Sequence, residues 1–406
     1  MSFLSKVVKS VMRPIGKALN GLGIRGLNSV YGVRPKSDSP APAVAPAKQP
    51  ISSLTTSQIA ALTSSQIQAL TLAEIAALSV EQLEAFTTSQ IQDFSTDQVG
   101  AFSPFQFSSF LNDQIGAFTT TQVGGGFTTA QVAALTTDQL SLGLTTNQFA
   151  ALTTADIAAL TTLQIQTGLT TAQLVALTTG QVGALTTEQL VTLSTSQIGL
   201  METEDVAALT SSQIAALTTN QVQLGLNTAQ IVALTTGQVA SLSSNQLQAL
   251  TTTQVGAIET IDLASLTTTQ IAVLTTDQIR LGLSTTQIAA LTTAEVAALT
   301  SQQIQSGLTT DQLVALSTEQ VSSLTTAQVV LLSTSQIGVI ETRDIAALTS
   351  NQIAALTTSQ IRVGLSTAQL TALGTAQIQA LTTEQIQSGL STEQIPVLTT
   401  NQIASL

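Results

Sequence analysis

An eight-residue unit with the pattern L-T-T-x-Q-I-x-A recurs almost without interruption from Leu54 to the C-terminus, in 43 consecutive copies. Position 1 is always Leu, Phe, Ile or Met, position 5 is always Gln, Glu or Asp, and position 6 is always a large apolar residue. Periodicity this strict is typical of a linear array of stacked units, in which each unit contacts only its neighbours. The sequence therefore favours an elongated structural protein over a protein with a single closed catalytic cleft.

The spacing of the apolar positions predicts the secondary structure of each unit. A strand would place apolar residues at alternate positions, whereas positions 1 and 6 have opposite parity. One continuous helix fails as well, because eight residues advance by about 800° and the apolar stripe would drift by roughly 80° per unit. We therefore expect one short helix per octad, and a β-solenoid is the alternative.

Positions 2 and 5 carry the signal for a helix start. Position 2 is Thr or Ser in 37 of the 43 units, and position 5 follows three residues later. This spacing is that of the capping box, flanked by a hydrophobic staple. In the first unit Thr55 is the expected N-cap and Gln58 its partner, with Leu54 and Ile59 as the staple. Helices this short are unstable alone, so stacking must stabilise them.

Eight units contain a ninth residue, and in each of them a glycine precedes the next position 1. These glycines are Gly126, Gly143, Gly168, Gly225, Gly282, Gly307, Gly364 and Gly389. We expect them to end the helices in the left-handed conformation. From Leu160 onward, the nine-residue units and the units that carry Gly199, Gly256 and Gly338 at position 7 are spaced so that one of these glycine-marked units recurs every three or four units. The fold expected is an all-α superhelical solenoid with about three to four units per turn.

Two further segments precede the array. Residues 1–34 are expected to form a cationic amphipathic helix. Residues 35–53 are rich in Pro, Ala and Ser and are expected to form an extended linker, so that 54–406 is the solenoid. The residues expected to attach the N-terminal helix to a membrane or a partner are Phe3, Leu4, Lys6, Val7, Lys9, Val11, Arg13 and Lys17.

Composition argues against catalysis and against nucleic-acid binding. The chain has no His, Cys or Trp, so the usual general base and soft metal ligands are missing, and we expect neither an enzyme nor a cofactor. The net charge is −12. Residues 51–406 hold 22 acidic residues against three basic ones, and such a surface repels phosphate backbones.

Three units carry Glu at position 2 and Asp at position 5. They are Glu202 with Asp205, Glu259 with Asp262, and Glu341 with Asp344. A ladder of calcium sites is one interpretation. The favoured one is that acidic residues suit a helix N-terminus, because calcium needs six or more converging oxygens and each unit offers two or three. We therefore expect no metal site, with these six residues as weak candidates.

Phenylalanine is concentrated in one stretch, at position 1 of six successive units. These residues are Phe86, Phe94, Phe102, Phe110, Phe118 and Phe127, with Phe105 and Phe107 nearby. An exposed patch for a partner is one interpretation. The favoured one is that the rings fill a wider part of the core, since position 1 is a core position elsewhere.

The octads LTTSQIAALTSSQIQAL (54–70) and FTTAQVAALTTDQLSL (127–142) resemble the Thr/Gln/Ala-rich tracts of large repetitive surface or adhesin-like proteins of proteobacteria. The resemblance covers residues 54–406 and implies an extracellular, structural role. The chain departs from such proteins because it lacks a recognisable export signal or translocator. The unit also resembles the first helix of transcription-activator-like effector repeats, but their second helix, base-reading loop and basic residues are missing.

These observations lead to one functional hypothesis and two alternatives. We expect a non-enzymatic stalk, spacer or adhesin-like element at the bacterial cell surface, attached through its basic N-terminal helix. The first alternative is a cytoplasmic, membrane-associated scaffold or peptide-binding solenoid, and the second is a filament subunit. The expected partners are an anionic membrane surface or an anchoring protein at residues 1–34, with self-association as a further expectation.

Overall fold

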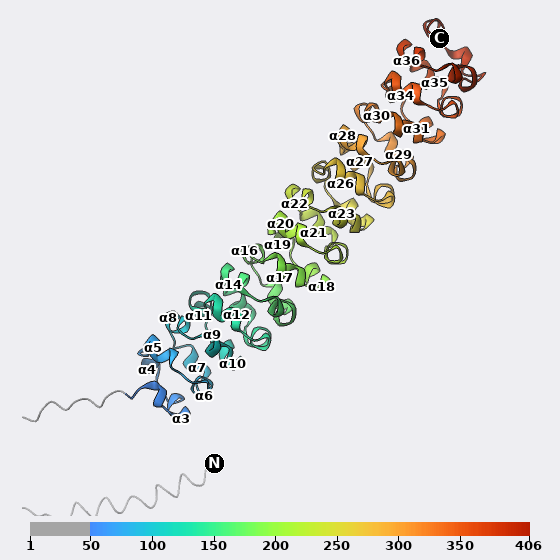
Figure 1. Cartoon of the computed structure of the whole chain (residues 1–406). Coiled ribbons are helices and arrows are strands. Elements are labelled where there is room, and N and C mark those ends of the chain that lie inside the picture. The colour runs from blue at the N-terminus through green and yellow to red at the C-terminus, as the bar shows by residue number, and fades with distance from the viewer. Residues whose placement is uncertain (1–48) are drawn as a thin grey trace, which may run out of the picture. The chain divides into compact units, whose positions relative to one another are not determined.

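Short helices follow one another along the whole repeat region. The computed structural model describes residues 49–406, of which Pro50–Leu406 form one compact unit (Figure 1). Within this range the secondary structure consists of helices without a strand, which confirms the all-α solenoid and shows that the β-solenoid alternative is wrong. None of the helices in this range is long and apolar enough to cross a bilayer. The expected N-terminal helix lies outside the described residues.

The α-helices of the first half are α3 (Thr56–Ile59), α4 (Ser64–Gln68), α5 (Leu72–Ala76), α6 (Val80–Glu84), α7 (Thr88–Ile91), α8 (Thr96–Gly100), α9 (Pro104–Ser108), α10 (Asn112–Ala117), α11 (Thr120–Gly126), α12 (Thr129–Ala134), α13 (Thr146–Ala151), α14 (Thr154–Ala159), α15 (Thr171–Val175), α16 (Thr179–Gly183), α17 (Thr187–Thr192), α18 (Thr195–Leu200), α19 (Thr203–Ala208) and α20 (Ser211–Ala216). Those of the second half are α21 (Thr228–Ala233), α22 (Thr236–Ala240), α23 (Ser244–Ala249), α24 (Thr252–Ala257), α25 (Thr260–Leu263), α26 (Thr268–Val273), α27 (Thr285–Ala290), α28 (Thr293–Ala298), α29 (Thr310–Val314), α30 (Thr318–Ser323), α31 (Thr326–Leu331), α32 (Thr334–Val339), α33 (Thr342–Ala346), α34 (Ser350–Ala355), α35 (Thr367–Ala372), α36 (Thr375–Gln379) and α37 (Thr400–Ile403). Two 3₁₀ turns, η1 (Ile51–Ser53) and η9 (Ile395–Val397), lie near the two ends of this range.

The unit that begins at Leu242 shows how one helix forms. Ser243 is the N-cap, with extended backbone angles (φ −70°, ψ 160°), and its hydroxyl accepts a hydrogen bond from the Gln246 amide. The Gln246 side chain in turn accepts one from the Ser243 amide at 2.8 Å. This reciprocal pair is the capping box, and it recurs in most helices of the array. The expectation drawn from positions 2 and 5 is confirmed.

Seven of the nine-residue units end in a π-helical turn. These turns are η2 (Gln139–Gly143), η3 (Gln164–Gly168), η4 (Gln221–Gly225), η5 (Gln278–Gly282), η6 (Gln303–Gly307), η7 (Gln360–Gly364) and η8 (Gln385–Gly389). The extra residue widens the turn, so that the Leu226 amide donates to the Gln221 carbonyl five residues earlier, at 3.0 Å.

The expectation that the ninth-position glycines are left-handed terminators is wrong. No glycine among the described residues has a φ in the left-handed region. The physical reason for glycine is close approach between turns. A Cβ on Gly225 would lie 3.0 Å from the Ile198 side chain and 3.3 Å from the Thr195 carbonyl oxygen, both in the preceding turn.

Helices three units apart pack on one another along the array. Examples are α9 with α12 and α16 with α19 (Figure 1). Helices α21 and α24 pack in the same way. Glycines of neighbouring turns meet in the same way: a Cβ on Gly116 would lie 2.9 Å from the carbonyl oxygen of Gly143. A Cβ on Gly256 would lie at the same distance from that of Gly282. These glycine-marked units therefore do stack on one another.

The core runs continuously along the array. Position 6 side chains are almost completely inaccessible in the interior units, as at Leu247 and Ile288, and position 1 side chains are nearly so, as at Leu250. All belong to a single apolar cluster that extends from Ile51 to Leu398. Each buried side chain of this size contributes about 1.5–3 kcal/mol, which is how helices of four to seven residues become stable.

Candidate functional site

The position 5 glutamines form a ladder of buried hydrogen bonds between successive turns. Gln246 is 2% exposed. Its Oε1 accepts from the Ser243 amide, and its Nε2 donates to the carbonyl oxygens of Ile214 and Leu217, both at 2.8 Å. One side chain therefore caps its own helix and also satisfies two buried carbonyl groups of the preceding turn.

This ladder extends along the described array. It begins where Gln82 donates to the Ile51 carbonyl oxygen at 2.9 Å and continues to Gln402, which donates to Leu373 at 2.8 Å. The donor and acceptor are 28 to 33 residues apart, and the larger separations span nine-residue units. Each of these hydrogen bonds therefore joins one turn of the superhelix to the preceding turn.

Sequence reasoning identified only the capping half of this role. The missed signal is the preference for Gln, which fills position 5 in 37 of the 43 units. A capping box accepts Glu as readily as Gln, because only an acceptor is needed. The inter-turn bonds need an NH₂ donor, which only the amide supplies.

The three Glu–Asp units depart from this pattern. Glu202, Glu259 and Glu341 each stand at the N-cap of a helix, and none of them makes a side-chain capping hydrogen bond. The aspartates are buried. Asp262 accepts a hydrogen bond from the Thr236 hydroxyl of the preceding turn at 2.6 Å.

The same arrangement occurs 82 residues later, where the Thr318 hydroxyl donates to Asp344 at 2.6 Å. Arg343 lies 2.9 Å from Glu341 and 3.5 Å from Asp344. These carboxylates therefore link neighbouring turns through a threonine, in place of the glutamine amide.

The third unit shows the electrostatic cost of a buried acid. Burial, and next the negative charge of Glu202, raise the pKa of the Asp205 carboxyl, while a hydrogen bond from the Glu202 backbone lowers it. The three acidic units are 57 or 82 residues apart and do not meet. In the part of the chain that the structure describes, no group of three His, Cys, Asp or Glu side chains is placed to hold a metal.

The phenylalanines of the first half lie in the core. Phe86, Phe94 and Phe102 are 2–3% exposed, and successive rings meet edge to face at 5.2 and 5.4 Å between centroids. Phe107 is fully buried, whereas Phe105 is 69% exposed. The core interpretation holds for the position 1 rings and not for Phe105.

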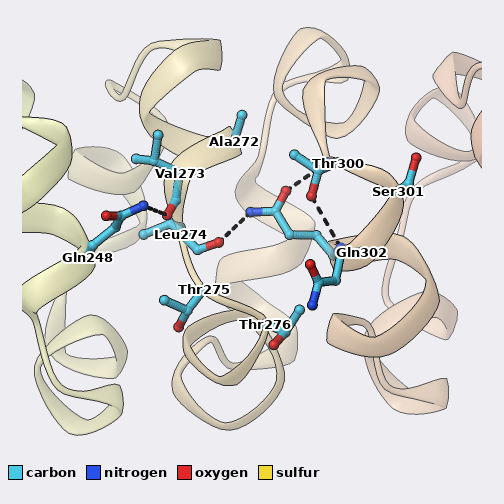
Figure 2. A pocket seen from close by; sticks show the side chains of 10 residues that line it. Gln248, Ala272, Val273, Leu274, Thr275, Thr276, Thr300, Ser301 and Gln302 are labelled. Atoms are coloured by element: carbon cyan, nitrogen blue, oxygen red, sulfur yellow. Dashed lines mark hydrogen bonds between the residues drawn. The ribbon is translucent and has the colours of Figure 1, made fainter.

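An open groove of about 690 Å³ lies between turns in the second half (Figure 2). It is lined by Gln248, Ala272, Val273, Leu274, Thr275, Thr276, Thr300, Ser301, Gln302 and Gln303. Gln248 bridges its rim by donating to the Val273 carbonyl oxygen at 3.1 Å (Figure 2). A second groove, of about 380 Å³, uses residues 82 positions later, among them Leu356, Thr357 and Glu384. Both grooves expose hydroxyl and amide groups, which can form hydrogen bonds with an extended polar ligand.

Exposed apolar side chains repeat with the same long spacing. Leu142, Leu224, Leu281 and Val363 occupy position 8 of nine-residue units and are 67–71% exposed. They are 82, 57 and 82 residues apart. The surface of the array therefore offers equivalent features on separate turns.

The residues expected to attach the chain to a membrane or partner, from Phe3 to Lys17, lie outside the described residues. Their role stays a prediction.

Seven stretches of the chain match the family model described as the ALTTAQ repeat. They are residues 167–199, 198–236, 225–257, 255–293, 306–339, 337–363 and 363–388, which together span more than half of the 406 residues. No curated protein matches the chain. Among solved structures, the chain is similar to the leucine-rich repeat-containing protein LegL7 from Legionella pneumophila, at 12% identity and a TM-score of 0.15. That match covers 61% of this chain and 79% of the other.

Proposed function

The chain belongs to the ALTTAQ repeat family, and from this premise we propose that it is a non-enzymatic stalk, spacer or adhesin-like element at the bacterial cell surface. In this proposal the basic segment 1–34 attaches the protein to the cell, and the solenoid acts as a spacer of fixed length. The observation that carries the proposal is the glutamine ladder, exemplified by Gln246 and Ile214.

A ladder of this kind supports a stiff spacer. Every interior turn is tied to the preceding one by a continuous apolar core and by buried hydrogen bonds. Buried amide–carbonyl bonds are costly to break, because the groups left behind are desolvated. Bending one turn away from the next would break several of them together, and this cost opposes bending.

Repetition supports an adhesive role. The two grooves and the exposed apolar side chains recur on separate turns with the same spacing. Equivalent weak contacts on one rigid support add through multivalency. The array needs no single high-affinity site to bind an extended, repetitive partner.

Surface labelling of intact native cells tests the proposal. The full chain should be accessible to external protease and to antibody. Its variant with Lys6, Lys9, Arg13 and Lys17 all changed to Gln should be lost from the cell fraction, because its attachment depends on positive charge. Detection of the full chain in the cytosol alone would contradict the surface role.

The grooves also favour a second candidate, a membrane-tethered scaffold inside the cell that binds peptides along the solenoid. Flotation of the full chain with anionic vesicles tests the tether. Co-flotation that is lost in the four-site Gln variant, combined with a cytosolic location, supports this candidate over the first. Retention of the full chain in the soluble fraction contradicts it.

A further inference from the structure

Glu295 occupies the ladder position in the unit that begins at Leu291, where most units carry Gln. The side chain is 2% exposed. Its Oε2 accepts a hydrogen bond from the Thr292 amide at 2.6 Å, so it completes the capping box. Its Oε1 is buried and has no hydrogen-bond partner among the described residues.

The flanking units show what normally stands at this place. Gln287 donates through Nε2 to carbonyl oxygens 32 and 29 residues earlier, at 3.1 and 2.8 Å. Gln303 does the same at 2.9 and 2.7 Å. The same separations from Glu295 lead to Leu263 and Leu266. Glu and Gln have the same length, so Oε1 takes the place of the donor nitrogen opposite two acceptors.

An ionised carboxylate cannot satisfy this arrangement, because it only accepts hydrogen bonds. A protonated carboxyl can, since its hydroxyl donates. We propose that Glu295 is a neutral carboxylic acid in the folded array, donating its proton to the carbonyl oxygen of Leu263 or Leu266, and that its ionisation loosens this turn. The turn then carries a pH-sensitive link among pH-insensitive glutamine links.

The surroundings favour the neutral form. Helix α28 packs against α26, which has no ionisable residue, and against α30, which carries only Glu319. Asp262 precedes Leu263, and Glu259 is the N-cap residue of the same helix. All these groups are acidic, so none offers a positive charge to a Glu295 carboxylate.

The pKa of Glu295 moves in the same direction. Burial raises it above the usual 4.5, and the hydrogen bonds from Thr292 oppose the rise. A raised folded-state pKa means that the contribution to stability is complete below the unfolded value and is lost as pH rises through the folded one. A bound divalent cation is a poorer solution, because it needs six or more oxygens and the register brings three together.

The test compares the full chain with Glu295→Gln, which restores the ladder donor, and with Glu319→Gln, which removes an exposed acid from the neighbouring helix. Infrared spectra at about pH 7 should show a neutral carboxylic acid band in the wild type and in Glu319→Gln, and Glu295→Gln should lack it. A band that is absent from the wild type, or that survives in Glu295→Gln, overturns the proposal.

Hydrogen exchange provides the second readout. Peptides covering residues 258–299 should exchange at the same rate in the wild type and Glu295→Gln at about pH 6, and at least about threefold faster in the wild type at about pH 9. Both values avoid the sequence pI of 4.2. Equal rates at both pH values, or a difference that does not change with pH, overturn the switch.

Discussion

The side-chain nitrogen of Gln246 lies 2.8 Å from the carbonyl oxygen of Ile214, thirty-two residues earlier in the chain. The other end of the same amide caps the Gln246 helix through Ser243. Formation of one helix is therefore coupled to its attachment to the preceding turn. Repeated along the array, this coupling makes a stack out of helices that are too short to persist alone.

Replacing Gln246 by Ala should loosen two turns at once. The change removes a helix cap and leaves the carbonyl groups of Ile214 and Leu217 buried without this donor. We expect a local loss of about 2–4 kcal/mol. Hydrogen exchange of the peptides around residues 214–250 measures it, since a long repeat array need not unfold in one step. The exposed neighbour Asn245 changed to Ala is the control, and equal effects of the two changes would contradict the ladder.

The close approach of turns at Gly256 should forbid a side chain. A Cβ there would lie 2.9 Å from the carbonyl oxygen of Gly282, a backbone atom that cannot move aside without shifting its turn. Gly256→Ala should therefore destabilise the array. Gly237 is also helical, and a Cβ there would meet only the Ser211 hydroxyl at 3.6 Å. Gly237→Ala should stabilise by about 0.5–1 kcal/mol, as alanine does in open helical positions. Thermal unfolding of both variants checks the opposite signs.

Phe107 and Phe105 provide a matched pair for the core. Phe107 is inaccessible and contacts the rings of Phe110, Phe118 and Phe127. Its replacement by Ala should cost about 3–5 kcal/mol, because it leaves a cavity. Phe105 is 69% exposed, so Phe105→Ala should change stability by less than about 0.5 kcal/mol. Similar losses on urea unfolding would mean that the rings do not fill the core as described.

Asp205 should make its unit less stable as pH rises. Burial and the charge of Glu202 raise the pKa of this carboxyl, so stability is complete below the unfolded value and declines as pH rises through the folded one. Asp205→Asn should therefore stabilise the array at about pH 8 more than at about pH 5.

Glu188 supplies the control for this pH dependence. Hydrogen bonds from its own backbone amide and from Thr186 and Thr187 lower its pKa, so its contribution is lost as pH falls. Melting temperatures of Glu188→Gln should show the opposite trend with pH. A stabilisation by Asp205→Asn that is independent of pH would count against the burial argument.

Much of the fold could be predicted from the octad alone. The separation of Thr55 and Gln58 is a local capping signal, and the apolar residues Leu54 and Ile59 specify the buried side of the helix. From Leu160 onward, the recurrence of glycine-marked units every three or four units predicted the size of the superhelical turn. Each of these signals lies within one unit or in simple spacing along the chain.

The features of the fold that could not be predicted depend on which residues the superhelical turn brings together. The bond from Gln90 to Ile59 joins two units, and their pairing follows from the number of units per turn. The eight-residue period does not contain that number. For Gly225, the sequence alone is compatible with a left-handed terminator and with a close approach between turns. The proximity of Gly225 to Ile198 identifies the close approach, and that proximity is a property of the stack.

Hydrogen exchange of the glutamine side-chain amides, followed by nuclear magnetic resonance on the full chain, tests the central claim most directly. The account predicts that most of these NH₂ groups exchange slowly, because their Nε2 atoms are buried and donate to carbonyl oxygens of the preceding turn, as Gln246 does to Ile214. Glutamine side chains that exchange as fast as those of an unfolded chain, while the backbone amides stay protected, would contradict it.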